Sequence, residues 1–260
     1  VGNAAKEMLG RTPANINASH PLKSGVIADY LVTEAMLRYF IGKAMGNAFI
    51  FKPEVMLAVP VGVTSVEARA VLDAALSAGA RNAYLMPEPL AAAIGAKVPI
   101  AEASGSMIVN SGGGTTEVAL ISLGGIVVSH SVRVAGSSLD DAIISHLRHS
   151  HGVLVGERTA EEIKINIGSA FDLETPLTLE VKGRDVISGL PKIVEVTSTQ
   201  IKEAIQRPLK EIVAGIKKVL EETPPELASD VIDKGMVLSG GTSLLRGFDK
   251  MLTAETGVPC

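Results

Sequence analysis

The fold is decided by residues 106–136, which read SMIVNSGGGTTEVALISLGGIVVSHSVRVAG. A short apolar run ends in three glycines, a β-branched alternating segment follows, and a Gly-Gly pair separates it from a second β-branched run. This order predicts a strand, a tight loop, a second strand, a hairpin turn and a third strand. Three successive glycines are more than a chain reversal requires.

The glycine run at residues 112–114 has two possible explanations. Glycines lack a Cβ atom, so backbone N–H groups can converge on an anion, and the hydroxyls of Thr115 and Thr116 add donors. These features favour a phosphate-binding loop. A flexible hairpin without a ligand explains the glycines equally well, because a short glycine run is a weak motif and this one lacks the lysine of a P-loop. The residues alone leave both interpretations open.

The composition of the whole chain narrows the class of protein. Its 260 residues are 47% apolar, with a mean hydropathy of +0.32, which provides for a large buried core in one or two domains. The net charge is −4, and the chain has no Trp, three Tyr and five Phe. Without a basic stripe or stacking aromatics, nucleic-acid binding is disfavoured.

Cysteine usage and hydropathy indicate a cytoplasmic setting. The single cysteine, Cys260, cannot form an internal disulfide, and no charged-then-apolar signal is visible at the N-terminus. The most apolar run, residues 55–63, is too short to span a bilayer and contains Pro60, so it predicts a buried strand.

Strands and helices alternate in the first part of the chain. Thr33 is a plausible cap for one helix, and Thr64 with Glu67 has the spacing of a capping box for another, which Gly79 closes. Such alternation predicts a parallel α/β layer with helices packed on it. The predicted helices cover residues 4–9, 32–45, 65–78 and 90–96, and the predicted strands cover residues 55–61 and 82–86.

Glu88 lies at the junction between the second of these strands and the helix that follows it. Open α/β sheets bind ligands at the carboxyl edge of their strands, so a carboxylate there is a candidate for polarising a water molecule. The competing interpretation is that Glu88 only favours the positive end of the helix. On the residues alone, we favour the second interpretation.

The second half of the chain repeats strand and helix signals. Ser137 or Ser138 is the predicted cap of a helix that ends in a solvated cluster of His146, His149 and His151, for which no carboxylate or cysteine spacing supports a metal site. Further on, Thr159 and Glu162 are spaced as a capping box. Strands are predicted over residues 177–186 and 192–197, a long helix over 200–221, and a strand–glycine–helix junction over 235–246.

Seven segments spread over the chain carry a family pattern. They are AKEMLGRTP (5–13), PLKSGVIAD (21–29), EPLAAAIG (88–95), GGGTTEVA (112–119), GERTAEEIK (156–164), TPPELA (223–228) and VLSGG (237–241). Together, and in this order, they resemble the actin-like ATPase superfamily and, within it, the MreB-like proteins of bacteria. A sugar kinase or chaperone ATPase fits less well, because residues 156–164 and the Thr-Pro-Pro turn match the filament family.

The resemblance implies an α/β, actin-like fold, a duplicated ribonuclease H-like architecture of two domains with ATP and Mg²⁺ in the cleft between them. It assigns residues 1–103 to the remainder of domain I, with 1–27 in its small subdomain and 28–103 in its large one. Residues 104–260 are assigned to domain II, in which 133–195 form the small-subdomain insertion.

The resemblance also implies a nucleotide site, residue by residue. The second phosphate loop is matched by Gly112, Gly113, Gly114 and Thr115. The nucleoside side is matched by two segments, Glu161, Glu162 and Lys164 in one and Gly240, Gly241 and Thr242 in the other. Glu88 matches the residue that positions the attacking water, and Asn110 stands where the family has an acidic residue. No residue is assigned as a direct metal ligand.

Partners follow from the same resemblance. MreB-like proteins polymerise into paired protofilaments on the inner membrane and guide cell-wall synthesis together with other cell-shape proteins. An apolar loop in the first domain aids membrane attachment in some members, and Phe49, Ile50 and Phe51 lie where that loop aligns. The chain is therefore expected to be cytoplasmic and inner-membrane-associated, to bind copies of itself, and not to bind nucleic acid.

The ends of the chain depart from the family pattern. That pattern opens with a hairpin carrying an Asp-Leu-Gly-Thr phosphate loop, which nothing before Val1 supplies, and it closes with a strand and helix beyond Cys260. On this comparison we expect a fragment that lacks the first strands of domain I and the C-terminal end.

A third departure lies in the second phosphate loop itself. Asn110 replaces the acidic residue, and Ser111 follows where an apolar residue is expected. An amide carries no negative charge for the hydration shell of magnesium or for water activation. The sequence therefore leaves ATPase activity open. It predicts an ATP-binding filament protein with impaired hydrolysis, and the alternative is a non-hydrolysing actin-like scaffold.

Overall fold

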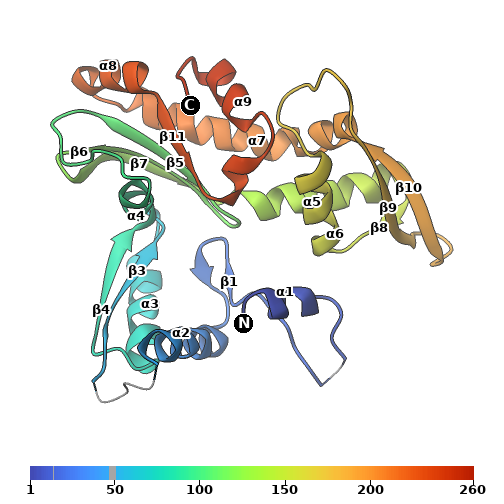
Figure 1. The fold of residues 1–260 in the computed structure, drawn as a ribbon, viewed down its shortest axis with the longest axis horizontal. Helices are drawn as coiled ribbons and strands as arrows, with labels where there is room; N and C mark the ends of the chain where they lie inside the picture. Colours follow the sequence, from blue (N-terminus) through green and yellow to red (C-terminus); the bar gives the residue numbers. More distant parts are fainter. Residues whose placement is uncertain (14, 47–50) are drawn as a thin grey trace. The chain divides into compact units, whose positions relative to one another are not determined.

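The computed structural model describes residues 1–13, 15–46 and 51–260. Within it the chain forms two compact units, Val1–Ala91 and Ala92–Cys260 (Figure 1). The division of the chain into actin-like domains at residues 103 and 104 stays a prediction.

The first unit combines two parallel strands with helices. Its elements are α1 (Asn3–Met8), β1 (Leu22–Lys23), β2 (Val26–Ile27), α2 (Tyr30–Met45), β3 (Glu54–Val59), α3 (Ser65–Ser77) and β4 (Asn82–Pro87), and α4 (Glu88–Gly95) continues into the second unit. β3 and β4 run parallel, with Leu57 opposite Leu85, as the alternating pattern predicted. α3 packs against both strands and against α2.

Two predicted helix caps in this unit have different outcomes. The capping box of α3 is confirmed, because Thr64 accepts from the Glu67 N–H and the Glu67 carboxylate accepts from the Thr64 N–H. The Thr33 cap is wrong. α2 begins at Tyr30, and its cap is Asp29, whose carboxylate accepts from the Val32 N–H at 3.0 Å. Thr33 lies inside the helix and donates to the Asp29 carbonyl at 2.6 Å.

The second unit contains two sheets and the longest helix. Its elements are β5 (Ser106–Ser111), β6 (Thr116–Ser122), β7 (Gly125–Val132), α5 (Gly136–His146), the π-helical turn η1 (Leu147–His151), β8 (Val153–Leu154), α6 (Glu157–Ile167), β9 (Thr178–Asp185), β10 (Pro191–Thr197), α7 (Ser198–Glu221), α8 (Pro225–Lys234), β11 (Met236–Ser239), the 3₁₀ turn η2 (Gly241–Leu244) and α9 (Phe248–Thr256).

The larger sheet has the strand order β11-β5-β6-β7. β5, β6 and β7 follow one another as antiparallel strands, which confirms the hairpins predicted for residues 106–136. β11 joins the other edge of β5 in parallel, with Val237 opposite Ile108. Because parallel strands end at the same edge of a sheet, the loops after β5 and β11 start side by side.

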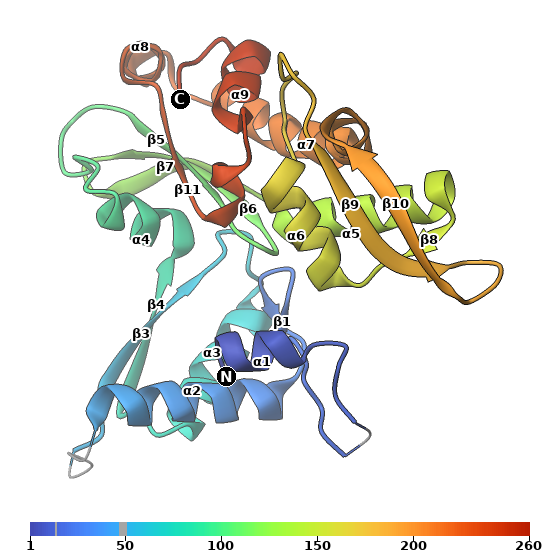
Figure 2. The same ribbon diagram turned by 45° about the vertical axis from the view of Figure 1, so that its right-hand side comes forward.

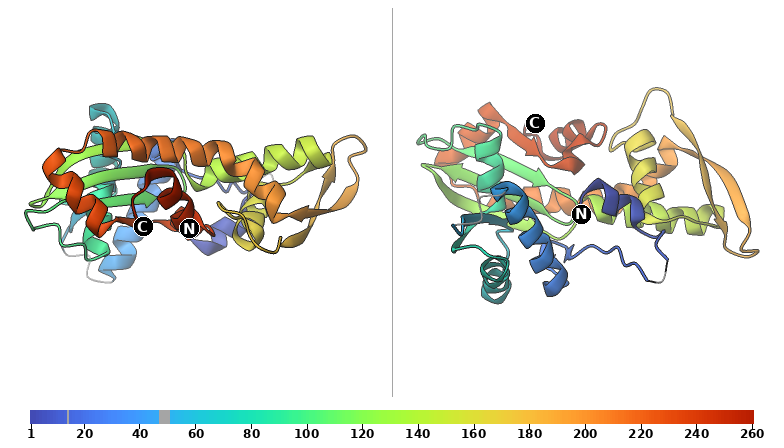
Figure 3. Two further views of the ribbon diagram at one scale, coloured as in Figure 1. Left: turned by 90° about the horizontal axis from the view of Figure 1, so that it is seen from above. Right: turned by 60° about the horizontal axis from the view of Figure 1, so that its bottom comes forward.

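α7 packs against β6 and β7 and also contacts α5, β10 and α9 (Figure 3). It begins two residues before the predicted start, with a capping box between Thr197 and Gln200. At Gly215 an added Cβ would lie 2.3 Å from Val132 Cγ2, so the helix meets β7 at a distance that only glycine allows. Its buried face repeats every three or four residues: Ile201, Ile205, Leu209, Ile212, Ile216 and Val219.

The smaller sheet has the order β10-β9-β8 and packs beside α6 (Figure 2). β9 and β10 form the antiparallel pair predicted for residues 177–186 and 192–197, with Val181 opposite Val194. Asp185 orders the connecting turn by accepting from the backbone N–H groups of Ile187 and Ser188. The Lys192 ammonium also pairs with Asp185 at 3.1 Å.

Two predicted caps in the second unit are wrong. α5 is capped by Ala135 and α6 by Gly156, neither of which makes a side-chain capping bond. Ser137 and Ser138 therefore lie inside α5, and Thr159 and Glu162 lie inside α6. In both helices a glycine stands at or just before the first residue, and the helix starts without a hydroxyl cap.

The junction after β11 also differs from the prediction. The two glycines lead into a 3₁₀ turn of four residues, Gly241–Leu244, and the α-helix begins only at Phe248. A ligand here would therefore meet a tight turn and not the amino end of a long helix.

The histidines at the end of α5 are less exposed than predicted. His146 and His151 have ring centroids 6.1 Å apart, and in the described part of the chain their buried Nε2 atoms make no hydrogen bond. Burial, assisted by His151, lowers the pKa of His146, and Glu203 opposes the change. Only His149 is solvated as predicted. No group of three or more His, Cys, Asp or Glu side chains among the described residues could hold a metal ion.

Candidate functional site

The loop between β5 and β6 is closed by its own backbone. The Gly112 N–H donates to the Thr115 carbonyl at 2.9 Å. The N–H groups of Gly113 and Gly114 donate to nothing within the described residues, and Gly113 is exposed. This turn therefore leaves two backbone donors available for a ligand, as a phosphate loop requires.

The threonines of this loop are less available than the sequence suggested. Thr116 is fully buried, and its hydroxyl donates to the Val134 carbonyl at 2.8 Å and meets Ser111 Oγ at 2.8 Å. This pairing explains how the polar Ser111 is accommodated inside the sheet. Thr115 is 6% exposed, and its part in a ligand site stays a prediction.

The loop after β11 packs against the glycine loop at residues 112–114 and forms a hydrogen bond with it. Gly240 has φ +87°, and a Cβ there would lie 2.2 Å from the Ser111 carbonyl oxygen, so only glycine fits this close approach. Two residues later, the Thr242 hydroxyl donates to the Gly112 carbonyl at 2.7 Å. Gly241 has open space around its Cα. Two predicted site segments, 130 positions apart in sequence, are therefore joined directly.

Gly136 connects this pair of loops to α5. Its N–H donates to the Gly112 carbonyl at 3.1 Å, and the next N–H, of Ser137, donates to the Gly113 carbonyl at 2.8 Å. A Cβ on Gly136 would lie 2.9 Å from Thr242 Oγ1 and 3.4 Å from Lys164 Nζ. Segments from β5, α5, α6 and β11 thus converge on one glycine.

Lys164 reaches this junction from α6. Its ammonium donates to the Gly136 carbonyl at 3.0 Å and to Asp140 Oδ2 at 2.9 Å. Both side chains are 14% exposed. Burial raises the pKa of Asp140 to about 6; the neighbouring Lys164 opposes this rise, and Glu161 and Asp141 add to it.

The two glutamates predicted beside Lys164 differ in their surroundings. The negative charge of Glu161 adds to the rise in the pKa of Asp140, and its side chain is partly buried. Glu162 points along the exposed side of α6, where its carboxylate accepts from Arg158 Nε at 3.0 Å. The parts of Glu161 and Glu162 in a ligand site stay predictions.

The two predicted catalytic residues belong to separate parts of the chain. Asn110 is partly exposed near the end of β5, opposite Ser239 of β11 and Glu117 of β6. Glu88 opens α4 and belongs to the first unit. A shared role for Glu88 and Asn110 stays a prediction.

Sequence reasoning missed Gly136 and Asp140. Gly136 follows a β-branched strand and opens a helix, which is a recognisable junction, but nothing in its neighbourhood indicates that it contacts residues 28 positions away. Asp140 resembles an ordinary acidic residue in the first turns of a helix. Its pairing with Lys164 depends on how α5 and α6 pack, which the local pattern does not contain.

The raised pKa of Asp140 predicts a specific pH dependence of stability. A carboxyl whose pKa is higher in the folded state binds protons more tightly there than in the unfolded chain. Ionised Asp140 therefore destabilises the fold at neutral pH, and this destabilisation disappears as protonation proceeds below about pH 6. Relative to Asp140→Asn, the wild-type free energy of unfolding should rise by on the order of 2 kcal/mol between about pH 7 and pH 4. Urea denaturation of both proteins across this range measures the difference, and a constant difference would contradict the prediction.

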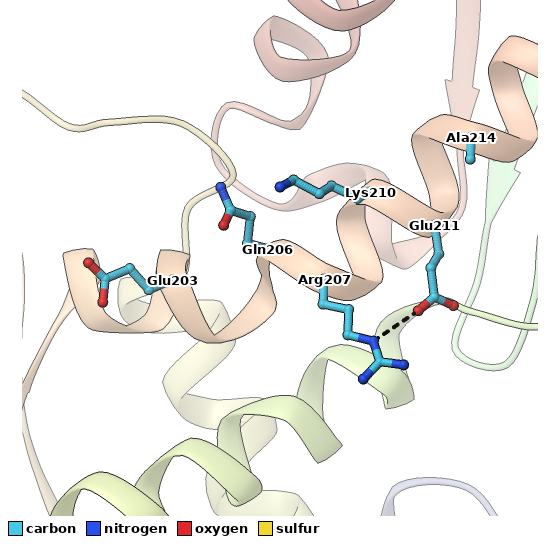
Figure 4. A pocket seen from close by; sticks show the side chains of 6 residues that line it. All are labelled: Glu203, Gln206, Arg207, Lys210, Glu211 and Ala214. Atoms are coloured by element: carbon cyan, nitrogen blue, oxygen red, sulfur yellow. Dashed lines mark ion pairs between the residues drawn. The ribbon is translucent and has the colours of Figure 1, made fainter.

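A hollow on α7 offers a different kind of surface. Figure 4 shows its lining along the exposed face of that one helix: Glu203, Gln206, Arg207, Lys210, Glu211 and Ala214. Arg207 Nε lies 3.5 Å from Glu211 Oε1, and the arginine side chain is 91% exposed. Charges of both signs on one solvated helix face do not converge on a ligand. The junction at Gly136 remains the candidate site.

The residues at that junction fit a phosphate-bearing ligand. Backbone donors at Gly113 and Gly114, open space at Gly241 and a lysine ammonium all favour an anion, and a Cβ at Gly136 or Gly240 would fill the place where the loops meet.

Comparison with known proteins identifies the family. The profile described as MreB/Mbl protein matches residues 1–260. The chain belongs to the MreB/Mbl family. It is 52% identical to the cell shape-determining protein MreB of Escherichia coli K12 over all 260 residues, which cover 75% of that protein. It is 45% identical to the cell shape-determining protein Mbl of Bacillus subtilis, of which it covers 78%.

Solved structures confirm the actin-like α/β fold of this MreB/Mbl chain. The crystal structure of MreB5 of Spiroplasma citri bound to ADP superposes with a TM-score of 0.92 at 36% identity, over 100% of this chain and 78% of that one. The MamK double helical filament superposes with a TM-score of 0.81 at 22% identity, over 98% of this chain and 76% of the MamK chain, and supports the fold alone. Among the described residues, no helix is both long and apolar enough to cross a membrane.

Proposed function

We propose that this MreB/Mbl chain is an ATP-binding, actin-like cytoskeletal protein that assembles into filaments and takes part in determining rod cell shape. The observation that carries the proposal is the junction at Gly136, where Lys164 and the loops at Gly112 and Thr242 meet. The names of the MreB and Mbl relatives support the cell-shape role, and the ADP and AMPPNP complexes of MreB5 support a nucleotide ligand.

The chain's own residues suggest how they would hold the nucleotide. The free N–H groups of Gly113 and Gly114 would bind phosphate oxygens. Lys164 and Glu161 from α6, with Gly240, Gly241 and Thr242, would lie on the nucleoside side. ATP would supply a phosphoanhydride bond, and Mg²⁺ would be held largely by the phosphates, as is usual for this ion. Glu88 would position water, a role we propose from the family pattern.

Calorimetric titration of the 260-residue chain with ADP tests the nucleotide ligand. We expect weak but saturable binding, with a dissociation constant between about 10 µM and 1 mM. Lys164→Met should weaken it, because a charged hydrogen bond contributes about 1.5–3 kcal/mol. Arg207→Met, on the exposed face of α7, serves as the matched control and should leave it unchanged. Absence of heat from the wild-type chain at millimolar ADP would overturn the proposal.

Asn110 bears on hydrolysis. We expect little ATP turnover from the present chain and a rise of at least about tenfold in Asn110→Asp, because a carboxylate can orient water or the hydration shell of magnesium where an amide cannot. Asn110→Ala serves as the control for loss of the amide. The measurement is the rate of phosphate release from ATP in the presence of Mg²⁺. Equal rates for Asn110→Asp and wild type would contradict a role of residue 110 in hydrolysis.

A non-hydrolysing actin-like scaffold is the second candidate, and Asn110 is the observation that favours it. The two functions separate in a sedimentation assay at fixed protein concentration. The ATP-dependent filament protein should pellet more with ATP and magnesium than without nucleotide, whereas the scaffold should pellet equally in both. Binding to proteins of cell-wall synthesis and cell shape is expected for both candidate functions and does not distinguish them.

Membrane attachment is proposed through residues 49–51, in keeping with a cytoplasmic protein at the inner membrane. Phe49 and Ile50 lie outside the described residues, and Phe51 is 79% exposed. Exposed aromatic side chains partition into the lipid interface. A Phe49→Ser, Phe51→Ser double variant should float with liposomes at least several-fold less than wild type, and undiminished flotation would dispose of this attachment site.

A further inference from the structure

The ammonium of Lys164 is held in one position by two oxygen acceptors. The Gly136 carbonyl lies 3.0 Å from Nζ and Asp140 Oδ2 lies 2.9 Å away, while Oδ1 lies at 2.8 Å without an aligned hydrogen bond. An ammonium group has three N–H donors, of which these acceptors use two. One donor is left for a ligand, and its direction is set by the other two.

Gly136 links the Lys164 ammonium to both loops of the site through its backbone. Its N–H donates to the Gly112 carbonyl, which also accepts from the Thr242 hydroxyl at 2.7 Å. A Cβ on Gly136 would lie 3.4 Å from Lys164 Nζ, so the lysine tip and the backbone are in contact. Displacing Lys164 therefore disturbs the same carbonyl cluster that holds the glycine loop.

The Asp140 carboxylate supplies the negative charge that compensates the partly buried Lys164 ammonium. With 14% of its side chain exposed, Lys164 has lost most of its hydration, and the one carboxylate paired with it in the described residues is that of Asp140. Removing one partner of such a pair leaves an uncompensated charge, which then moves toward solvent.

We propose that Asp140 is the positioning residue for Lys164 in the nucleotide site, and that nucleotide binds more tightly when Asp140 is ionised. This inference rests on the nucleotide-binding function proposed above. Asp140 acts through Lys164 and does not itself touch the ligand.

Asp140 also changes charge in an accessible pH range. Its surroundings are Lys164 and Glu161 on α6 and Asp141 on its own helix, and burial raises its pKa to about 6. Because binding and protonation are linked, a nucleotide that favours the ionised form must lower the pKa of Asp140 in the complex. An anionic nucleotide that acted on Asp140 only through its charge would raise this pKa, so a fall distinguishes the positioning role.

Carbon-13 NMR of the Asp140 carboxyl in the wild-type chain tests this coupling without any variant. Titration from about pH 4.5 to pH 8 is performed without nucleotide and at saturating ADP. We expect the pKa of Asp140 to fall by at least about half a unit in the complex, which corresponds to roughly threefold tighter binding to the ionised form. A pKa that stays or rises on saturation would overturn the inference.

Variants provide a second test. Asp140→Asn should weaken ADP binding about tenfold at pH 8, as expected for loss of a charged hydrogen-bond partner. The ratio of its dissociation constant to that of wild type should shrink toward pH 5, and taking the ratio cancels the titration of ADP itself. Asp172→Asn is the control for loss of a carboxylate, because this side chain is 79% exposed and pairs with Lys202.

The outcomes separate this inference from the proposed function. A wild-type chain that binds no ADP refutes the nucleotide-binding function. A wild-type chain that binds ADP with an unchanged Asp140 pKa and a constant ratio refutes only the role of Asp140. Circular dichroism at each pH establishes that Asp140→Asn is folded. If this variant does not fold, the NMR titration of the wild-type chain alone decides the test.

Discussion

Gly240→Ala is expected to lower the free energy of unfolding by at least about 3 kcal/mol. Two costs add at this position. The backbone φ of +87° is one that residues with a side chain rarely adopt, and the new methyl group would lie 2.2 Å from the Ser111 carbonyl oxygen. Backbone atoms of β5 cannot yield without disturbing the pairing of β5 with β11.

Gly241→Ala is a matched control one residue away. This position has no positive φ, and no heavy atom lies within 4 Å of an added Cβ among the described residues. Its effect should stay below about 1 kcal/mol. Urea denaturation of the two variants and wild type measures the contrast. Similar midpoints for Gly240→Ala and Gly241→Ala would show that the β5 and β11 loops are not packed as described.

Phe248→Ala is expected to cost about 3–5 kcal/mol, the range found for truncating a fully buried aromatic side chain. Phe248 is 0% exposed and is the first residue of α9, directly after the loop that carries Gly240, Gly241 and Thr242. The cavity would open beneath the attachment of that loop to the sheet. Loss of stability should therefore be accompanied by weaker ADP binding.

The control for Phe248 is a large apolar residue that the core does not bury. Leu244 lies four positions earlier and is 84% exposed. Leu244→Ala should change the free energy of unfolding by less than about 0.5 kcal/mol. A small effect of Phe248→Ala, close to that of the control, would mean that α9 contributes little to the second unit.

Long periodic segments of this protein are predictable from sequence. The spacing of apolar residues in α7 and the alternation in β9 and β10 predicted these elements within about two residues, because burial of one face has a fixed period. The capping box at Thr64 was also predictable. The one proposed at Thr159 was wrong because the same residue spacing occurs inside α6, where Gly156 had already started the helix.

The site could be predicted in part. Resemblance located the loops at Gly112 and Gly240 and the lysine of α6, and the structure joins these three through Gly136. The same resemblance assigned Glu162 to the nucleoside side. In the structure its carboxylate pairs with Arg158, and its part in a ligand site stays a prediction. Asp140 carries no local signal, because its importance arises from the packing of α5 against α6.

One exposed apolar residue lies in the β9–β10 turn of the smaller sheet. Ile187 is 97% exposed at the tip of the β9–β10 hairpin, on a turn that Asp185 holds rigidly through three hydrogen bonds. Those bonds and the Lys192 ammonium lower the pKa of Asp185 far below its usual range.

Amide NMR during an ADP titration tests most directly whether the glycine loop binds the phosphates. The largest shifts are predicted at Gly113 and Gly114, whose N–H groups are free in the described residues, with smaller shifts at Gly241. Gly189, at the tip of the β9–β10 hairpin, should not move. Saturation that leaves Gly113 and Gly114 unchanged, or that shifts the exposed face of α7 instead, would contradict the site.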